Sequence, residues 1–332
     1  LRICIIGRTE LLLQTAKSLA KNHEIGMIIT SESSDHDNIQ SKDFMNFAHS
    51  IGAKFIKTQK INRKEIQSKI KKYNFDLGIS LNNLLLLDKK TLSLFKYGVL
   101  NCHFGDLPRY RGNACANWAI LNGEKRICIV IHLMDEGLDS GNIIVKKYFP
   151  VNDKTTIQEF YAYGEVISTL FLRAIKIIKS GKRGKKQTRN PKRILRTYPR
   201  NKFDGKINWD DSVHHIDRLI RASGKPFFGA YTFYNSKKLF ILEFSIEHPK
   251  FRYSSVNGQV AERRKGGEVV ISCSDGFLIL SKVKYEGRTY NKPTTLIKTI
   301  HTRLGMNVEE EIEEIKKDFT LLKKKLGKKF FY

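Results

Sequence analysis

The first 180 residues alternate short apolar runs with amphipathic stretches, and this alternation limits the fold more than any other feature. Buried strands are indicated at Arg2–Ile6, Glu24–Thr30, Lys54–Thr58 and Leu77–Leu81, with helical patterns between them. Strands that alternate with helices are typical of βαβ units, in which the strands run parallel. The sequence therefore predicts an α/β domain with a doubly wound, Rossmann-like parallel sheet.

The hydrophobic pattern changes after about residue 180, so the α/β domain is expected to end there. The residues that follow divide into three further segments. Residues 181–202 are basic, contain Gly and Pro and show little apolar periodicity, which indicates a linker. Short alternating strands over 203–304 predict a small, OB-like β-barrel domain. Apolar residues spaced by three and four over 305–332 predict an amphipathic helix that docks on its own domain or pairs with another chain.

The net charge of +27 raises the question of a nucleic-acid partner. The excess is concentrated in Lys176–Arg200 and Lys316–Lys329. A lysine-rich composition combined with a polyanionic small substrate would explain the same charge, so charge alone leaves both readings open.

Other global features argue against several classes of protein. The five scattered cysteines show no metal-ligand spacing, which indicates reduced thiols, a cytoplasmic location and no metal site. No apolar run approaches the roughly 18 residues that a membrane helix needs, and Leu1–Gly7 resembles a strand more than a signal peptide.

The turn after the first strand does not have the pattern of a dinucleotide site. Gly7 lacks the spacing of a G-x-G-x-x-G motif, so NAD binding is not expected. Arg8, which follows it, is either a phosphate contact or a solvated side chain.

Two predicted strands run into loops that carry polar side chains suited to catalysis. Asn101 and His103 end the strand that begins at Val99, and Asp139 follows the strand Ile127–Leu133. Because the carboxyl ends of parallel strands form the ligand crevice, we expect these side chains to meet. The amide can stabilise an oxyanion, the imidazole, neutral at cytoplasmic pH, can relay a proton, and the carboxylate can fix its tautomer. This trio predicts acyl transfer.

Two nearby features allow more than one interpretation. Cys102 lies between the two polar residues and could be a nucleophile, but strand alternation should point it away from His103. The run Leu84–Leu87 follows a strand and could line a flat apolar pocket, although by itself it favours a place in the core.

The motifs Asn101-Cys102-His103, Leu107-Pro108-Arg109-Tyr110-Arg111-Gly112 and Leu138-Asp139-Ser140-Gly141 together closely resemble the catalytic region of formyltransferases that use N10-formyltetrahydrofolate. The resemblance covers residues 1–180 and implies that Asn101, His103 and Asp139 are the catalytic residues. It also implies that the leucine run belongs to the pterin pocket and not to the core. The residues that match this pocket are Leu84, Leu85, Leu86, Leu87, Asp135, Glu136 and Leu138.

The resemblance continues into the second domain through Asp204-Gly205-x-Ile207-x-Trp209. This segment is similar to the C-terminal domain of methionyl-tRNA and nucleotide-amino-sugar enzymes, which the purine enzymes lack. The runs Asn117–Glu124 and Asp43–Ala48 resemble the corresponding segments of the sugar enzymes. In addition, Ser31–Lys42 is short and acidic where the tRNA enzymes carry a basic insertion for phosphates.

These similarities favour transfer of a formyl group to an amino deoxysugar linked to UDP, dTDP or GDP, as in the synthesis of lipopolysaccharide and other surface polysaccharides. Arg8, Asn83 and Arg109 are candidate contacts to the phosphates or the sugar, and a homodimer is possible. A methionyl-tRNA formyltransferase is the alternative, which the basic linker favours. A basic RNA-binding protein without activity is a second alternative, and the intact catalytic trio argues against it.

Overall fold

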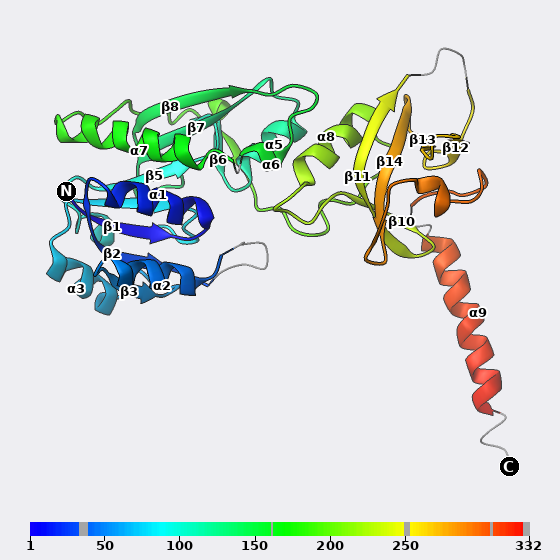
Figure 1. Ribbon diagram of the computed structural model, residues 1–332, viewed down its shortest axis with the longest axis horizontal. Coiled ribbons are helices and arrows are strands. Elements are labelled where there is room, and N and C mark those ends of the chain that lie inside the picture. Colours follow the sequence, from blue (N-terminus) through cyan, green and yellow to red (C-terminus); the bar gives the residue numbers. More distant parts are fainter. Residues whose placement is uncertain (33–38, 161, 249–252, 306–307, 328–332) are drawn as a thin grey trace. The chain divides into compact units, whose positions relative to one another are not determined.

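The structure is a computed structural model that describes residues 1–32, 39–160, 162–248, 253–305 and 308–327. The chain forms two compact units (Figure 1). The first consists of residues 1–200 with 224–227, and the second of the remaining residues from 201 onward. Each unit has its own sheet and its own buried core.

The first unit contains a seven-stranded sheet in the order β3-β2-β1-β4-β5-β7-β8. The first five of these strands in the chain are parallel, which confirms the predicted Rossmann-like sheet. The strands of the sheet are β1 Arg2–Gly7, β2 Glu24–Thr30, β3 Lys54–Lys57, β4 Leu77–Leu81, β5 Val99–His103, β7 Arg126–Leu133 and β8 Ile143–Pro150.

The last two strands differ from the prediction, because β7 is antiparallel to β5 and β8 is antiparallel to β7. The connection after β5 contains only the short strand β6 (Tyr110–Gly112) and the seven-residue helix α5 (Cys115–Leu121). The chain therefore returns from the edge at which β5 ends, and Val130 of β7 pairs with His103. Asp139 consequently follows a strand that runs opposite to β5, so the expected meeting of two parallel strand ends was wrong.

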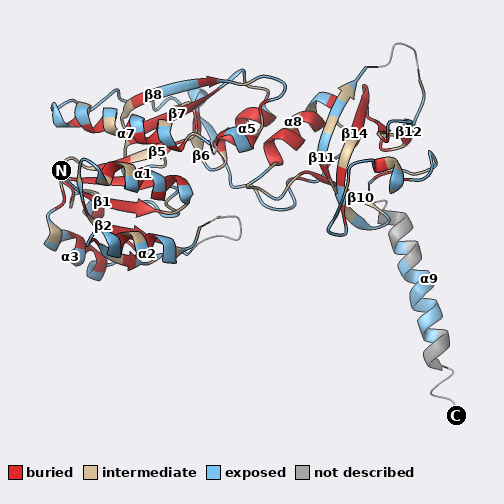
Figure 2. Ribbon diagram, viewed as in Figure 1, coloured by how far each residue is buried: buried red, intermediate tan, exposed pale blue. Residues whose placement is uncertain are grey.

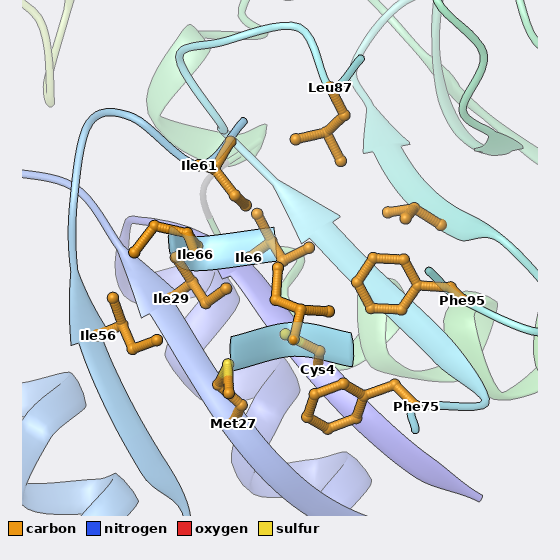
Figure 3. Packing of buried hydrophobic residues seen from close by; sticks show 12 residues of the cluster. Cys4, Ile6, Met27, Ile29, Ile56, Ile61, Ile66, Phe75, Leu87 and Phe95 are labelled. Carbon is orange, nitrogen blue, oxygen red and sulfur yellow. The ribbon is translucent and has the colours of Figure 1, made fainter. Parts of the chain in front are cut away.

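Helices cover both faces of this sheet. Alternate side chains of β1 point to opposite faces, and on one face Cys4 and Ile6 pack with Ile66 of α3 (Figure 3). Helices α1 and α7 pack on each other and on strands of the sheet. Figure 2 shows the strands as a largely buried layer. The helices of this unit are α1 Glu10–Ala20, α2 Ser41–Ser50, α3 Lys64–Tyr73, α4 Lys89–Leu92, α6 Ile157–Phe160 and α7 Gly164–Lys179, besides α5.

Side chains at the starts of three helices make different contacts. The amphipathic stretch from Thr156 through Ile178 forms two helices, α6 and α7, with Thr156 and Glu159 forming a hydrogen-bonded cap at the first. The Asn62 side chain does not cap α3, which begins at Lys64, and binds the loop before α4 instead. Asp88 caps α4 by accepting from Thr91 N at 2.7 Å.

The basic segment after α7 runs along the first unit. Lys185 pairs with Ile143 at the end of the sheet. The strand β9 (Leu195–Thr197) forms a two-stranded parallel ladder with β6. The Trp118 indole of α5 donates to the carbonyl oxygen of Tyr198. Residues expected to form a linker therefore bind the α/β unit through backbone and side-chain contacts.

The second unit is built on an antiparallel sheet in the order β10-β11-β14-β13-β12, with β15 on β14. The segment 302–305 donates to or accepts from the backbone of Gly258, Val260 and Phe233, so it bridges the two outer strands. This half-barrel confirms the predicted antiparallel domain, while its OB-like character stays a prediction. Its elements are α8 Val213–Ser223, β10 Tyr231–Tyr234, β11 Lys237–Glu247, β12 Val260–Arg263, β13 Val269–Ser272, β14 Phe277–Tyr285, β15 Arg288–Tyr290 and the terminal helix α9 Val308–Gly327.

Candidate active site

Strand β5 carries the first two residues of the predicted trio. Asn101 and His103 are two positions apart, so their side chains leave the same face of the strand. Asn101 is half-buried, whereas His103 is buried beneath the turn that follows the strand. Gly105 has no room for a side chain, because a Cβ there would lie 2.6 Å from His103 Nε2. The turn can therefore close directly over the imidazole.

Asp139 reaches this pair from the loop between β7 and β8. Its Oδ2 lies 3.5 Å from His103 Nδ1 and accepts a hydrogen bond from Gly112 N at 2.9 Å. Its backbone has a φ of 48°, in the left-handed region that residues other than glycine seldom adopt. The structure thus brings the expected imidazole and carboxylate together, by a folded-back loop instead of a strand end.

Both ring nitrogens of His103 face groups that accept hydrogen bonds. Nδ1 is beside the Asp139 carboxylate, and Nε2 lies 2.7 Å from the carbonyl oxygen of Tyr110. A carbonyl oxygen cannot donate, so the ring satisfies both partners only when both nitrogens carry protons. Burial lowers the pKa of His103, but the Asp139 carboxylate, the Cys115 sulfur and the Tyr110 carbonyl oxygen together more than offset this and hold the pKa above its ordinary value. The expectation of a neutral imidazole was therefore wrong for this state of the site.

The pKa of the Asp139 carboxylate is shifted in the opposite direction. Burial raises the pKa of Asp139, but the His103 imidazolium, the nearby His132 and the Gly112 N–H favour the ionised form. The pKa of Asp139 is consequently held well below its usual range. Asp139 and His103 together form a buried ion pair within the site.

His132 is a site residue that the sequence did not reveal. It lies on β7 directly opposite Asn101, and its Nε2 is 3.1 Å from Asn101 Nδ2 and 3.5 Å from Asp139 Oδ1. Its Nδ1 is 3.2 Å from the carbonyl oxygen of Leu133, which must accept, so in the neutral ring Nε2 accepts from the Asn101 amide. A polar residue inside an otherwise apolar strand was the signal that could have identified it.

Gln187 is a second residue that the sequence did not reveal. Its Nε2 donates to the carbonyl oxygens of Asp139 at 2.8 Å and Gly141 at 2.7 Å. Its Oε1 accepts from Arg111 Nη2 at 2.9 Å. The side chain is thereby fully used in holding the loop that carries Asp139. Its place in a basic segment expected to be a linker offered no signal of this role.

The sulfur atom next to His103 belongs to Cys115 and not to Cys102. The Cys115 Sγ lies 3.5 Å from His103 Nε2 and 3.0 Å from Thr197 Oγ1. Cys102 is buried, and burial raises the pKa of its thiol well above the ordinary value. Because a thiolate is the reactive form, Cys102 is a poor nucleophile, as strand alternation predicted.

The leucine run divides into an exposed part and a buried part. Leu84, Leu85 and Leu86 are 56%, 43% and 49% exposed, whereas Leu87 is 1% exposed and packs in the cluster of Figure 3. Three consecutive exposed leucines form an apolar ledge at the end of β4, which pairs with β5. Exposed apolar surface of this kind commonly marks a binding site.

Side-chain amides hold the leucine ledge in place. Asn62 donates from Nδ2 to the carbonyl oxygen of Leu86 and accepts at Oδ1 from Asp88 N and the Thr91 hydroxyl. Asn83 donates to the carbonyl oxygen of Leu85 at 2.6 Å. The ledge is therefore a fixed surface despite its exposure.

The second predicted pocket wall, residues 135–138, is also held by a side chain. Asp135 Oδ1 accepts from the Ser140 hydroxyl at 2.6 Å and from Gly137 N at 3.2 Å. Glu136 is exposed and Leu138 is half-buried. The assignment of these residues to a pterin pocket stays a prediction.

The three candidate substrate contacts lie in different surroundings. Arg109 pairs with Glu124 and lines a cavity of about 450 Å³ beside the turn after β5. Asn83 lines a separate cavity of about 140 Å³ at the ends of β2 and β4, together with Leu84 and Leu85. Arg8 is half-buried at the end of β1, where its backbone N donates to Leu81 O. The structure does not bring Arg109 and Asn83 into one cavity.

Among the residues that the structure describes, no group of three or more His, Cys, Asp or Glu side chains is arranged to hold a metal ion. Within the same part of the chain, every helix is too short or too polar to cross a membrane.

Both units match models of known protein families. Residues 2–169 match the family model described as formyl transferase, and residues 200–300 match the model of the formyl transferase C-terminal domain. A methionyl-tRNA formyltransferase of Fusobacterium nucleatum subsp. nucleatum is 28% identical over 92% of this chain and 99% of its own.

Solved structures share the fold at lower sequence identity. The sugar 3N-formyl transferase WlaRD, solved with dTDP and 5-N-formyl-THF, superposes with a TM-score of 0.60 at 22% identity, over 87% of this chain and 98% of its own. An N-formyltransferase from Helicobacter canadensis, in complex with folinic acid and dTDP-3-aminofucose, gives 0.61 at 23% identity, over 86% of this chain and all of its own.

Proposed function

Because the chain belongs to the formyl transferase family in both of its units, we propose that it transfers a formyl group from N10-formyltetrahydrofolate to the amine of a nucleotide-linked amino deoxysugar. The observation that carries the proposal is the contact of His103 with Asp139 beside Asn101. These are the amide, imidazole and carboxylate that formyl transfer to an amine requires. The expected nucleotide is UDP, dTDP or GDP.

The reaction forms a bond between the sugar amine and the formyl carbon and breaks the bond from that carbon to N10 of the folate. One proton passes from the attacking nitrogen to the departing one. The bound folate supplies an activated formyl group whose carbonyl oxygen gains negative charge during attack. The protein must therefore stabilise this charge and move the proton.

Asn101 supplies the first of these functions. With His132 neutral and its Nδ1 protonated, one hydrogen of the Asn101 amide is directed to His132 Nε2, so the amide plane is held and the second hydrogen is available to the developing oxyanion. Loss of one such donor typically lowers the rate by ~10²–10³. Fixing the donor before the reaction avoids the cost of orienting it in the transition state.

His103 supplies the second function, starting as an imidazolium. We infer that its Nε2 proton leaves the Tyr110 carbonyl oxygen for the departing nitrogen and that the ring recovers a proton from the attacking amine. Asp139 holds the ring through Nδ1 and compensates its charge throughout. This order of proton transfers begins with an acid, in contrast to a neutral imidazole acting as a base.

The leucine ledge and the Asp135 loop are suited to hold a flat heteroaromatic ring. Leu84, Leu85 and Leu86 offer an apolar surface, and the loop from Asp135 to Leu138, which the Asp135 side chain holds through Gly137 N, carries further backbone polar groups. Ligand pockets commonly combine apolar walls with a few fixed polar groups. We therefore assign the pterin of the formyl donor to this part of the site.

Three features of the sequence support a sugar over a tRNA. The Asn117–Glu124 run and the Asp43–Ala48 run resemble sugar enzymes, and Ser31–Lys42 is not basic, although residues 33–38 of it lie outside the described part of the chain. WlaRD and the Helicobacter canadensis protein, which share the fold, are both described with dTDP or a dTDP-sugar.

A methionyl-tRNA substrate is the second candidate. The basic segment is favourable to an RNA backbone, because Lys182, Arg183, Lys185 and Lys186 are exposed along the first unit. The relative in Fusobacterium nucleatum carries that activity in its name. The two proposed substrates predict opposite results in one assay that offers both.

The purified chain should be incubated with N10-formyltetrahydrofolate and a panel of UDP-, dTDP- and GDP-linked amino deoxysugars, with uncharged and Met-charged initiator tRNA in parallel. We expect mass spectrometry to find a formyl adduct on a sugar amine and none on Met-tRNA. Formylation of Met-tRNA alone would contradict the sugar proposal. A His103→Ala variant with near-normal turnover would contradict the catalytic assignment.

A further inference from the structure

The terminal helix α9 exposes a row of large apolar side chains. Ile312, Ile315, Phe319 and Leu322 are 45%, 64%, 59% and 56% exposed. Figure 2 colours the described residues in the middle of this helix as exposed. Exposed apolar rows of this size usually mark an interaction surface. This surface is separate from the residues assigned to formyl transfer.

The spacing of the row is that of a coiled-coil seam. The four residues are separated by steps of three, four and three, which are the a and d positions of a heptad. The helix has 20 residues and is therefore about 30 Å long. Val308 and Leu326 continue the same spacing in the sequence at the two ends of the helix.

The sequence of α9 is also divided by charge. Residues 308–314 contain five glutamates and no basic residue, whereas residues 316–325 contain five lysines and one acid, Asp318. Two parallel copies would place acidic part beside acidic part and basic part beside basic part. Two antiparallel copies would place opposite charges together, which also suits the helix dipoles.

The apolar row is compatible with this antiparallel pairing. With the two copies centred on Lys317, Ile312 opposes Leu322 of the second copy and Ile315 opposes Phe319 of the second copy. Each a position then meets a d position, and the pattern is the same when the two copies are exchanged. Such a self-complementary surface is what a twofold homodimer needs.

We propose that α9 pairs with α9 of a second copy of this chain in an antiparallel two-helix coiled coil centred on Lys317. The pairing buries Ile312, Ile315, Phe319 and Leu322 of both copies. It goes beyond the proposed activity and does not depend on which amine is formylated.

The first experiment measures the mass of the full chain in solution by light scattering during size-exclusion chromatography. We expect about twice the chain mass of 38.3 kDa for the wild type and the single mass for Leu322→Glu. Leu321→Glu is the matched control, because Leu321 is its neighbour and is 57% exposed but lies outside the row. A wild-type monomer, or equal effects of the two variants, would overturn the proposal.

The second experiment determines the direction of pairing by disulfide trapping. The native cysteines of the described chain are buried, so introduced surface cysteines can be oxidised selectively. In the antiparallel coil Ile312→Cys and Leu322→Cys should cross-link to each other when mixed, and neither to itself, since like positions are about 15 Å apart along the axis. Cross-linking of each variant to itself would show parallel pairing.

The third experiment tests the contribution of charge. Replacing lysines 323–325 with Glu should make the full chain monomeric, as should replacing glutamates 309–311 with Lys. A mixture of the two variants should restore the dimer mass, because opposite charges again meet. Dimers in either variant alone would show that charge does not select the partner.

Discussion

The Gln187 Nε2 donates a 2.8 Å hydrogen bond to the carbonyl oxygen of Asp139, so a residue 48 positions later in the chain holds the backbone of the proposed catalytic carboxylate. The same nitrogen donates to Gly141, and the same side chain accepts from Arg111. The loop that carries Asp139 is therefore braced from a segment that the sequence presents only as basic and irregular. A strained backbone at Asp139, with φ of 48°, persists when its surroundings fix it in this way.

Removal of the Gln187 amide should impair catalysis without removing a catalytic group. We expect Gln187→Ala to lower kcat by about tenfold or more with little change in KM, because small misplacements of a catalytic group are costly. Steady-state kinetics for both substrates provide the measurement, with Lys186→Ala as an exposed neighbouring control. Equal loss in both variants would mean that Gln187 does not position Asp139.

The ion pair between His103 and Asp139 predicts a coupled change in titration. In Asp139→Asn the pKa of His103 should fall toward its ordinary value, because the carboxylate that raises it is gone. The rate should fall by roughly 10²-fold or more, as in other sites where a carboxylate holds an imidazole. NMR titration of the His103 ring measures the first effect. An unchanged His103 pKa would exclude Asp139 as its cause.

The same pair predicts how stability depends on pH. The folded pKa of His103 is raised, so its contribution is complete below the ordinary value of 6.5 and is lost as pH rises toward the folded value. The folded pKa of Asp139 is lowered, so its contribution is complete above 3.8 and is lost as pH falls below that. The free energy of unfolding of the wild type minus that of Asp139→Asn should therefore be largest between pH 3.8 and 6.5. Denaturant unfolding at several pH values would measure it, and a pH-independent difference would count against the pair.

Replacement of two adjacent leucines, Leu86 and Leu87, should affect different properties of the protein. Leu86→Ala should raise KM for the formyl donor with little effect on stability, because this side chain is exposed on the ledge. Leu87→Ala should lower the free energy of unfolding by about 2–5 kcal/mol, because it empties a buried position in the core. Denaturant unfolding and kinetics on both variants separate the effects. A folate KM unchanged in Leu86→Ala would remove the ledge from the proposed pterin pocket.

The linear sequence was sufficient to determine the α/β sheet, the antiparallel second unit and the terminal helix, because hydrophobic periodicity and turn residues act locally. It also indicated Asn101, His103 and Asp139 as candidates, because the motifs that contain them together resemble the catalytic region of formyltransferases. These features depend on neighbours within a few positions, which the sequence displays directly.

Only the tertiary structure decided the direction of β7, the charge of His103 and the roles of His132 and Gln187. Each depends on groups distant in the sequence: β7 follows the path of a 22-residue connection, and the His103 charge requires both Asp139 and the Tyr110 carbonyl oxygen. Burial and pairing energies arise only when such groups are brought together and water is excluded. Local pattern could therefore propose the catalytic residues, whereas long-range contacts set their protonation and their orientation.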